Sequence, residues 1–151
     1  MPKTLIIGYG NSLRRDDGLG IAAAERLMEI FAEQDGIEVV AATQLTPELA
    51  DKIKNFTEVV FIDCSVEGEP GEIAMNEISA RPDIIPRLEH SISPAYIINL
   101  TKKLYNTNPH AIVFSLTGKE FGLGESLSEK VSNQLGNLIE GIRKYIEGLY
   151  Q

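Results

Sequence analysis

The chain has 151 residues and a formal net charge of −8, from 22 acidic and 14 basic side chains. This length predicts a single domain over residues 1–151 that needs no disulfide, and Cys64, the only cysteine, fits a reducing compartment such as the cytoplasm. The acidic balance disfavours nucleic acid and anionic membrane as partners, and no apolar run approaches the about 20 residues that span a bilayer.

The first third of the chain alternates between strand and helix patterns. A short apolar run at 5–7 is followed by glycine and predicts a buried strand, and 37–42 predicts a second strand. Between them, the stretch 21–31 is rich in helix-forming residues. Its apolar side chains have the spacing of one buried helix face: Ile21, Ala24, Leu27, Met28 and Phe31. Thr46 and Pro47 predict the start of a short helix, because threonine caps helices and proline suits their first position.

The middle of the chain predicts two further strands and a long loop. The stretch 59–62 is apolar throughout and predicts a buried third strand. The stretch 72–78 alternates, which predicts a half-exposed strand with Ile73 and Met75 facing inward. The connection between these strands is too short for a parallel crossover, so we expect the second to run antiparallel at a sheet edge. Two prolines within 79–93 predict a loop there.

The last third predicts helix, strand and helix. Ser93 and Pro94 predict another helix start, and its expected buried face carries Tyr96, Ile97, Leu100 and Leu104. The stretch 110–116 predicts the last strand, and the capping-box spacing of Ser126 and Glu129 predicts the start of a long C-terminal helix. The whole pattern predicts a three-layer α/β fold, with a mostly parallel five-stranded sheet, one antiparallel edge strand and helices on both faces.

Side chains able to bind a metal ion follow the predicted strands. Asp16 and Asp17 come after the first strand, Asp63 ends the third, and His90 lies in the long loop. Open α/β sheets place their sites at the carboxyl ends of their strands, so we expect these side chains to converge there. Two carboxylates and an imidazole suit a borderline divalent metal such as Ni²⁺ or Zn²⁺ and leave coordination positions open for a substrate.

Each of these residues also has a structural interpretation. Asp16 or Asp17 at a helix start commonly serves as a cap or a dipole partner, but one cap needs only one acid. Asp63 directly after an apolar strand is harder to explain structurally, because a half-buried carboxylate needs a partner. His90 in a loop is by default a solvated side chain, and we interpret His110 at a strand start as structural.

Cys64 allows a different chemistry. A lone cysteine beside a strand end usually behaves as a small buried apolar residue. A nucleophilic pair of Cys64 and His90 is the alternative, although the sequence indicates no third group to orient such a pair.

Two interpretations compete for the loop after the first strand. Gly8, Tyr9 and Gly10 resemble the start of a dinucleotide-binding fingerprint, which would make this a nucleotide-binding α/β protein. However, Leu13 stands at the position of the third glycine, and a pyrophosphate would lie beside two aspartates that repel it.

The same loop resembles the motif of the hydrogenase maturation endopeptidases. That motif is Gly-x-Gly-Asn-x-Leu, two variable residues, an acidic pair and Gly-x-Gly, and residues 8–20 read Gly-Tyr-Gly-Asn-Ser-Leu-Arg-Arg-Asp-Asp-Gly-Leu-Gly. The segment 88–95 also resembles the histidine region of this family. The segment 118–129 resembles its last loop more loosely, because the proline usual there is absent.

The resemblance implies an endopeptidase that removes the C-terminal extension of a nickel–iron hydrogenase large-subunit precursor. It implies that Asp17, Asp63 and His90 are the catalytic, metal-binding residues, and that the nickel arrives with the precursor. Zinc or cadmium would suit the same ligands. Because three ligands without a thiolate form an incomplete cage, we expect the free protein to bind metal weakly. The alternative function is a non-catalytic nickel-binding module for hydrogenase assembly.

Overall fold

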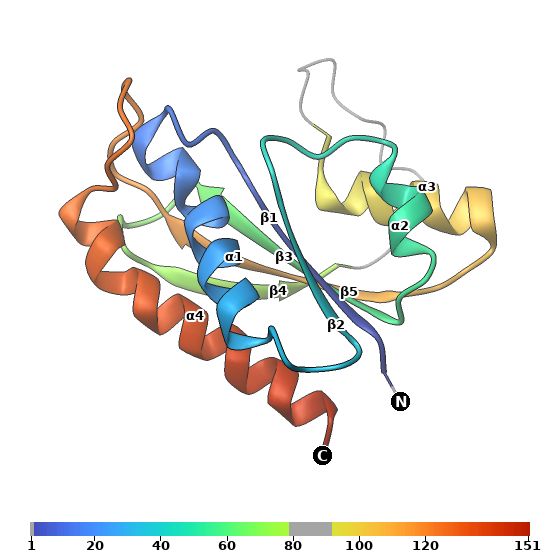
Figure 1. Ribbon diagram of the computed structural model, residues 1–151. Coiled ribbons are helices and arrows are strands. Elements are labelled where there is room, and N and C mark those ends of the chain that lie inside the picture. The colour runs from blue at the N-terminus through green and yellow to red at the C-terminus, as the bar shows by residue number, and fades with distance from the viewer. Residues whose placement is uncertain (1, 79–91) are drawn as a thin grey trace.

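The computed structural model describes residues 2–78 and 92–151, which form a five-stranded sheet with helices on both faces (Figure 1). The strands lie in the order β2-β1-β3-β5-β4. Their bounds are Thr4–Tyr9 for β1, Ile37–Ala42 for β2, Glu58–Ser65 for β3, Ile73–Glu77 for β4 and His110–Thr117 for β5. All neighbouring pairs are parallel except β4 and β5, which are antiparallel. The predicted fold class and the antiparallel edge strand are therefore confirmed.

The helices divide between the two faces of the sheet. Their bounds are Leu19–Ile30 for α1, Leu49–Ile53 for α2, Pro94–Tyr105 for α3 and Glu129–Leu149 for α4, and a short 3₁₀ helix, η1, spans Arg15–Gly18. One core joins the sheet to α1 and α4, and a second core joins it to α2 and α3 (Figure 1). Within the described ranges, no helix is both long enough and apolar enough to cross a membrane.

Alternation along the central strands supplies both cores. Ile6 and Val60 face α1 and α4, whereas Leu5, Val59 and Phe61 face α2 and α3, because successive strand side chains point to opposite sides. All five side chains are fully buried. Burying each one contributes about 1.5–3 kcal/mol relative to exposure, so the middle of the sheet is a stable base for the loops at its edges.

Three predicted helix starts have different outcomes. Ser93 caps α3 as predicted, with its hydroxyl accepting a hydrogen bond of 3.1 Å from the amide of Tyr96. The prediction for α2 is wrong, because the helix begins at Leu49 and the turn before it places Glu48, not Thr46, at the N-cap. The predicted cap of the C-terminal helix is also wrong. The N-cap of α4 is Ser128, and not Ser126: the hydroxyl of Ser128 accepts a hydrogen bond of 3.4 Å from the amide of Val131.

Three predicted buried positions are instead exposed. Met28 is 38% exposed because the buried stripe of α1 runs through Ala23, Ala24 and Leu27. Met75 is 54% exposed on β4, where only one neighbouring strand is present. Leu104 is 60% exposed in the last turn of α3.

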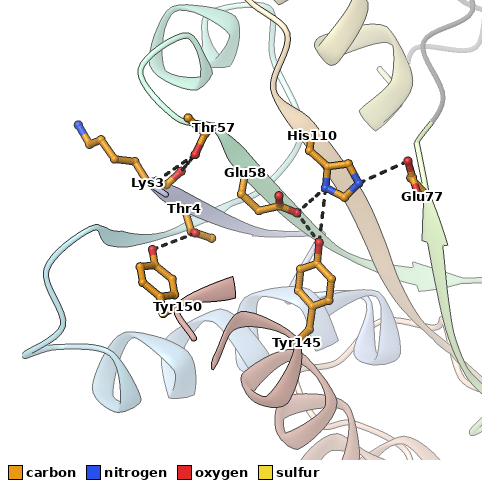
Figure 2. A network of polar contacts seen from close by, with 8 residues as sticks. All are labelled: Lys3, Thr4, Thr57, Glu58, Glu77, His110, Tyr145 and Tyr150. Atoms are coloured by element: carbon orange, nitrogen blue, oxygen red, sulfur yellow. Dashed lines mark hydrogen bonds and ion pairs between the residues drawn. The ribbon is translucent and has the colours of Figure 1, made fainter. Parts of the chain in front are cut away.

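A polar cluster lies at the amino edge of the sheet, where the parallel strands begin (Figure 2). Glu58 is nearly buried there and accepts hydrogen bonds from the Tyr145 hydroxyl and from Nδ1 of His110, the latter at 2.7 Å. Nε2 of His110 lies 3.4 Å from a carboxylate oxygen of Glu77. These contacts connect β3, β5, β4 and α4, which agrees with the structural role predicted for His110.

Candidate functional site

The two aspartates proposed to act together lie at the carboxyl edge of the sheet, where the parallel strands end. Gly8 of β1 pairs with Ile62 of β3, so Asp63 is one residue beyond this pair. Asp17 belongs to η1, which follows β1 at the same edge and contacts β3. Parallel pairing of adjacent strands therefore brings Asp17 and Asp63 to the same end of the sheet.

Two glycines make this close arrangement possible. Gly10 has φ of 147°, and a Cβ at this position would lie 1.9 Å from the carbonyl oxygen of Asp17. A Cβ on Gly20 would lie 2.5 Å from the Tyr9 carbonyl oxygen and 2.9 Å from that of Ile62. A side chain at either position would collide with these backbone atoms. Glycine at position 10 therefore allows the loop to pack against the backbone of Asp17, and glycine at position 20 allows the start of α1 to pack against β1 and β3.

Asp17 is half-buried and held by its own loop. Its Oδ2 accepts a hydrogen bond of 2.8 Å from the backbone amide of Asn11. Asn11 in turn shapes the loop, because its side-chain oxygen accepts a hydrogen bond of 2.9 Å from the amide of Leu13. This local turn therefore helps to fix the carboxylate of Asp17.

Asp63 occupies a half-buried position that changes its acidity. Burial is the largest of the causes that raise its pKa to about 6, and the negative charge of Asp17 also raises it. Hydrogen bonds from the Tyr9 hydroxyl and the Cys64 amide act in the opposite direction. Because the charge of Asp17 affects Asp63, the two carboxylates share one electrostatic environment.

Tyr9 is a site residue that sequence reasoning missed. Alternation along β1 and β3 puts Tyr9 and Asp63 on the same face of the sheet, at adjacent positions. Burial, followed by the charge of Asp63, raises the pKa of Tyr9, so its hydroxyl stays protonated and can donate to the carboxylate. Pairing the two predicted strands could have found Tyr9. Gly8 pairs with Ile62, so the next residues along the two strands, Tyr9 and Asp63, are neighbours.

Asp16 has a structural function that differs from the predicted helix cap. Its side chain is fully buried and caps neither η1 nor α1. It accepts hydrogen bonds from the amides of Lys119 and Glu120, each at 2.8 Å, and from the amide and hydroxyl of Ser128, each at 2.7 Å. Burial would raise the pKa of Asp16, but these hydrogen bonds outweigh it and lower the pKa. Asp16 therefore attaches the glycine loop to the start of α4.

His90, the third predicted ligand, lies outside the described residues. Within 2–78 and 92–151, no three histidine, cysteine or acidic side chains are grouped so that they could hold a metal ion. The predicted metal site of Asp17, Asp63 and His90 is therefore not completed by the described residues alone.

Comparison with known proteins identifies the family. The family model HycI, described as hydrogenase maturation protease, matches residues 21–145. The chain belongs to the hydrogenase maturation proteases. A Methanocaldococcus jannaschii protein provisionally named as such a protease is 29% identical over 144 residues, which cover 90% of this chain and 91% of the relative.

Solved structures of hydrogenase maturation proteases have the same fold. The [NiFe] hydrogenase maturation protease HycI from Thermococcus kodakarensis superposes with a TM-score of 0.77 at 22% identity, covering 97% of this chain and 93% of that one. The hydrogenase maturating endopeptidase HybD from E. coli gives a TM-score of 0.74 at 18% identity, with the same coverage. These similarities extend over nearly the whole length of each chain.

The geometry of this hydrogenase maturation protease disfavours a cysteine nucleophile. Cys64 is half-buried, and a Cβ on Gly118 would lie 2.9 Å from its sulfur, so the thiol lies under the loop that follows β5. Burial first, and then the charges of Asp17, Asp63 and Asp16, raise the pKa of Cys64 to about 12. The thiol therefore remains protonated near neutral pH, whereas cysteine nucleophiles react as thiolates.

Proposed function

We propose that this maturation protease removes the C-terminal extension of a nickel–iron hydrogenase large-subunit precursor after nickel has been inserted. Among its solved relatives, the protein from Thermococcus kodakarensis is named as a [NiFe] hydrogenase maturation protease. The observation that carries the proposal is the position of Asp17 and Asp63 at the same carboxyl edge, where η1 contacts the end of β3.

In this proposal the nickel ion belongs to the substrate. Asp17, Asp63 and His90 contact the nickel in the precursor, and zinc or cadmium can occupy the same ligands in vitro. The negative charge of Asp17 disfavours ionisation of Asp63, and a cation bound by both carboxylates would remove that repulsion. Recognition of the metal would therefore make cleavage depend on completed nickel insertion.

The residues of the chain then position the peptide for hydrolysis. With the nickel-bearing part of the precursor held by the carboxylates, its C-terminal extension lies along the carboxyl edge. Holding the reacting groups in register supplies a large part of the rate enhancement in many enzymes. The metal ion of the substrate can additionally polarise the scissile carbonyl or lower the pKa of an attacking water.

A cleavage assay followed by mass spectrometry tests the proposal. The wild-type protein should shorten nickel-loaded precursor and leave nickel-free precursor intact. His90→Ala should abolish tail removal, whereas His110→Gln, which changes the histidine at the opposite edge, should retain it.

Two outcomes would contradict the proposal. Normal tail removal by His90→Ala would eliminate the proposed ligand set. Nickel-dependent association without any loss of precursor mass would instead identify a non-catalytic assembly module.

A further inference from the structure

The most exposed apolar side chains are concentrated at the carboxyl edge. Seven large apolar side chains are exposed in the described ranges, and the four most exposed are Leu123 at 80%, Val66 at 76%, Leu104 at 60% and Leu13 at 57%. Leu13 follows β1, Val66 follows β3 and Leu123 follows β5, whereas Leu104 is at the end of α3. Because these three strands are consecutive in the sheet, one exposed apolar side chain stands on each of three neighbouring loops.

Hydrogen bonds connect these three loops to one another. The amide of Gly124 donates to the Leu13 carbonyl at 2.9 Å, and the amide of Arg15 donates to the Gly124 carbonyl at 2.9 Å. In Figure 1 the loops after β1 and β5 accordingly lie side by side. The loop after β3 is attached in the same way, through the Gly118 amide and the Ser65 carbonyl at 2.9 Å.

Further hydrogen bonds hold the loops that carry these side chains. Fully buried Asp16 holds the loop after β1 against the loop after β5 with the hydrogen bonds described above. The hydroxyl of Thr117 donates to the Glu67 carbonyl at 3.0 Å, next to Val66. The three exposed apolar side chains are thus carried by loops that are hydrogen-bonded to one another at the edge where Asp17 and Asp63 lie. Exposed apolar side chains gathered at one edge commonly mark an interaction site.

We infer that Leu13, Val66 and Leu123, here called the apolar rim, dock the body of the hydrogenase large-subunit precursor beside its cleavage point. The inference rests on the proposed function. Leu13 is four residues before Asp17, and Val66 is three residues after Asp63. A precursor segment that reaches both carboxylates therefore comes close to the loops that carry the rim, so the precursor is the occupant that we assign to it. The net charge of −8 disfavours an anionic membrane as the occupant.

Serine substitutions in the apolar rim test this inference. Each of Leu13→Ser, Val66→Ser and Leu123→Ser should raise KM for the nickel-loaded precursor by about threefold to tenfold, as expected for apolar interface anchors. The triple variant should lower kcat/KM by about 100-fold while kcat at saturating precursor changes little. Binding to immobilised precursor should weaken in parallel.

Matched controls separate docking from general surface effects. Leu104→Ser and Met75→Ser remove side chains that are 60% and 54% exposed at other places, and both should stay within about twofold of wild type. Thermal unfolding monitored by circular dichroism verifies that all variants are folded. A triple variant with the KM and binding of these controls would overturn the inference.

The outcomes also distinguish this inference from the proposed function. If wild type binds the precursor without shortening it, the proposed function fails, and binding by the triple variant still decides the role of the rim. If wild type neither binds nor cleaves, both fail. If size-exclusion chromatography shows a wild-type dimer and a monomeric triple variant, the rim is a contact between copies of this chain, and the inference is wrong.

Discussion

At the scale of single residues, the acidic pair shows how neighbouring side chains acquire different functions. Asp16 is fully buried, and the hydrogen-bond partners of its side chain lie more than 100 residues away in the chain, whereas the side chain of Asp17 is held by Asn11 of its own loop. Successive side chains at the start of a helix point about 100° apart, so only one of the two can face the strand ends. Asp16 therefore stabilises the loop, and Asp17 remains available to a substrate.

Paired substitutions should separate these two functions. Asp17→Asn should lower precursor cleavage by about 100-fold or more while the free energy of unfolding changes by less than about 1 kcal/mol. Asp16→Ala should lower the free energy of unfolding by about 3 kcal/mol, because it leaves several buried donors without an acceptor. Cleavage kinetics and urea unfolding measure both, with exposed Asp35→Asn as the control. If Asp16→Ala and Asp17→Asn lowered the free energy of unfolding equally, the assignment of a structural role to Asp16 alone would be wrong.

At the scale of elements, the start of α1 determines how far Asp17 lies from Asp63. Glycine at position 20 allows the helix to touch the backbone of two strands, and no larger residue fits without moving the helix. The helix carries no side-chain cap at this end, so packing rather than capping fixes its position.

Gly20→Ala should lower the free energy of unfolding by more than about 2 kcal/mol, because its Cβ would collide with rigid backbone atoms. Gly136→Ala is a suitable control, since a Cβ there meets nothing within 4 Å in α4. That control should stabilise the protein by about 0.5–1 kcal/mol, because alanine favours helix. Chemical unfolding measures the free energy of unfolding of both variants. Similar free energies for the two would show that α1 can shift to accommodate the added methyl group.

The polar cluster at the amino edge should make stability depend on pH. The hydrogen bond to Glu58 is the main cause that raises the pKa of His110; burial opposes it, and the charges of Glu58 and Glu77 add to it. Because the folded-state pKa exceeds the unfolded value of about 6.5, the stabilisation from His110 is complete below that value and is lost as pH rises through the folded-state pKa. Tyr145, which also faces Glu58, has a raised pKa and stays neutral throughout this range.

Unfolding in urea at several pH values tests this dependence. The stability difference between wild type and His110→Gln should be largest near pH 6 and should shrink as the solution becomes more alkaline. A difference that grew with increasing pH would show that the imidazole is held in its neutral form.

At the scale of the whole molecule, hydrophobic periodicity and connection lengths sufficed to predict the sheet and its antiparallel edge. The same rules brought Asp17 and Asp63 to one edge, because parallel strands must end together. The partners of Asp16 could not be predicted, since they depend on how the loop after β5 folds back onto η1. The exposure of Leu13 could not be predicted either. A leucine near a helix start usually packs inward, whereas Leu13 is 57% exposed in a loop that is hydrogen-bonded to Gly124, more than 100 residues away.

The separation of the two sheet edges also has a practical consequence for measuring this enzyme. Asn108 is exposed just before β5 begins, far along the sheet from the carboxylates. A thiol introduced there by Asn108→Cys would accept a fluorescent dye readily, because the native Cys64 is half-buried under Gly118. Such a label, or a sensor chip coupled through it, would leave the opposite edge unobstructed for an arriving substrate.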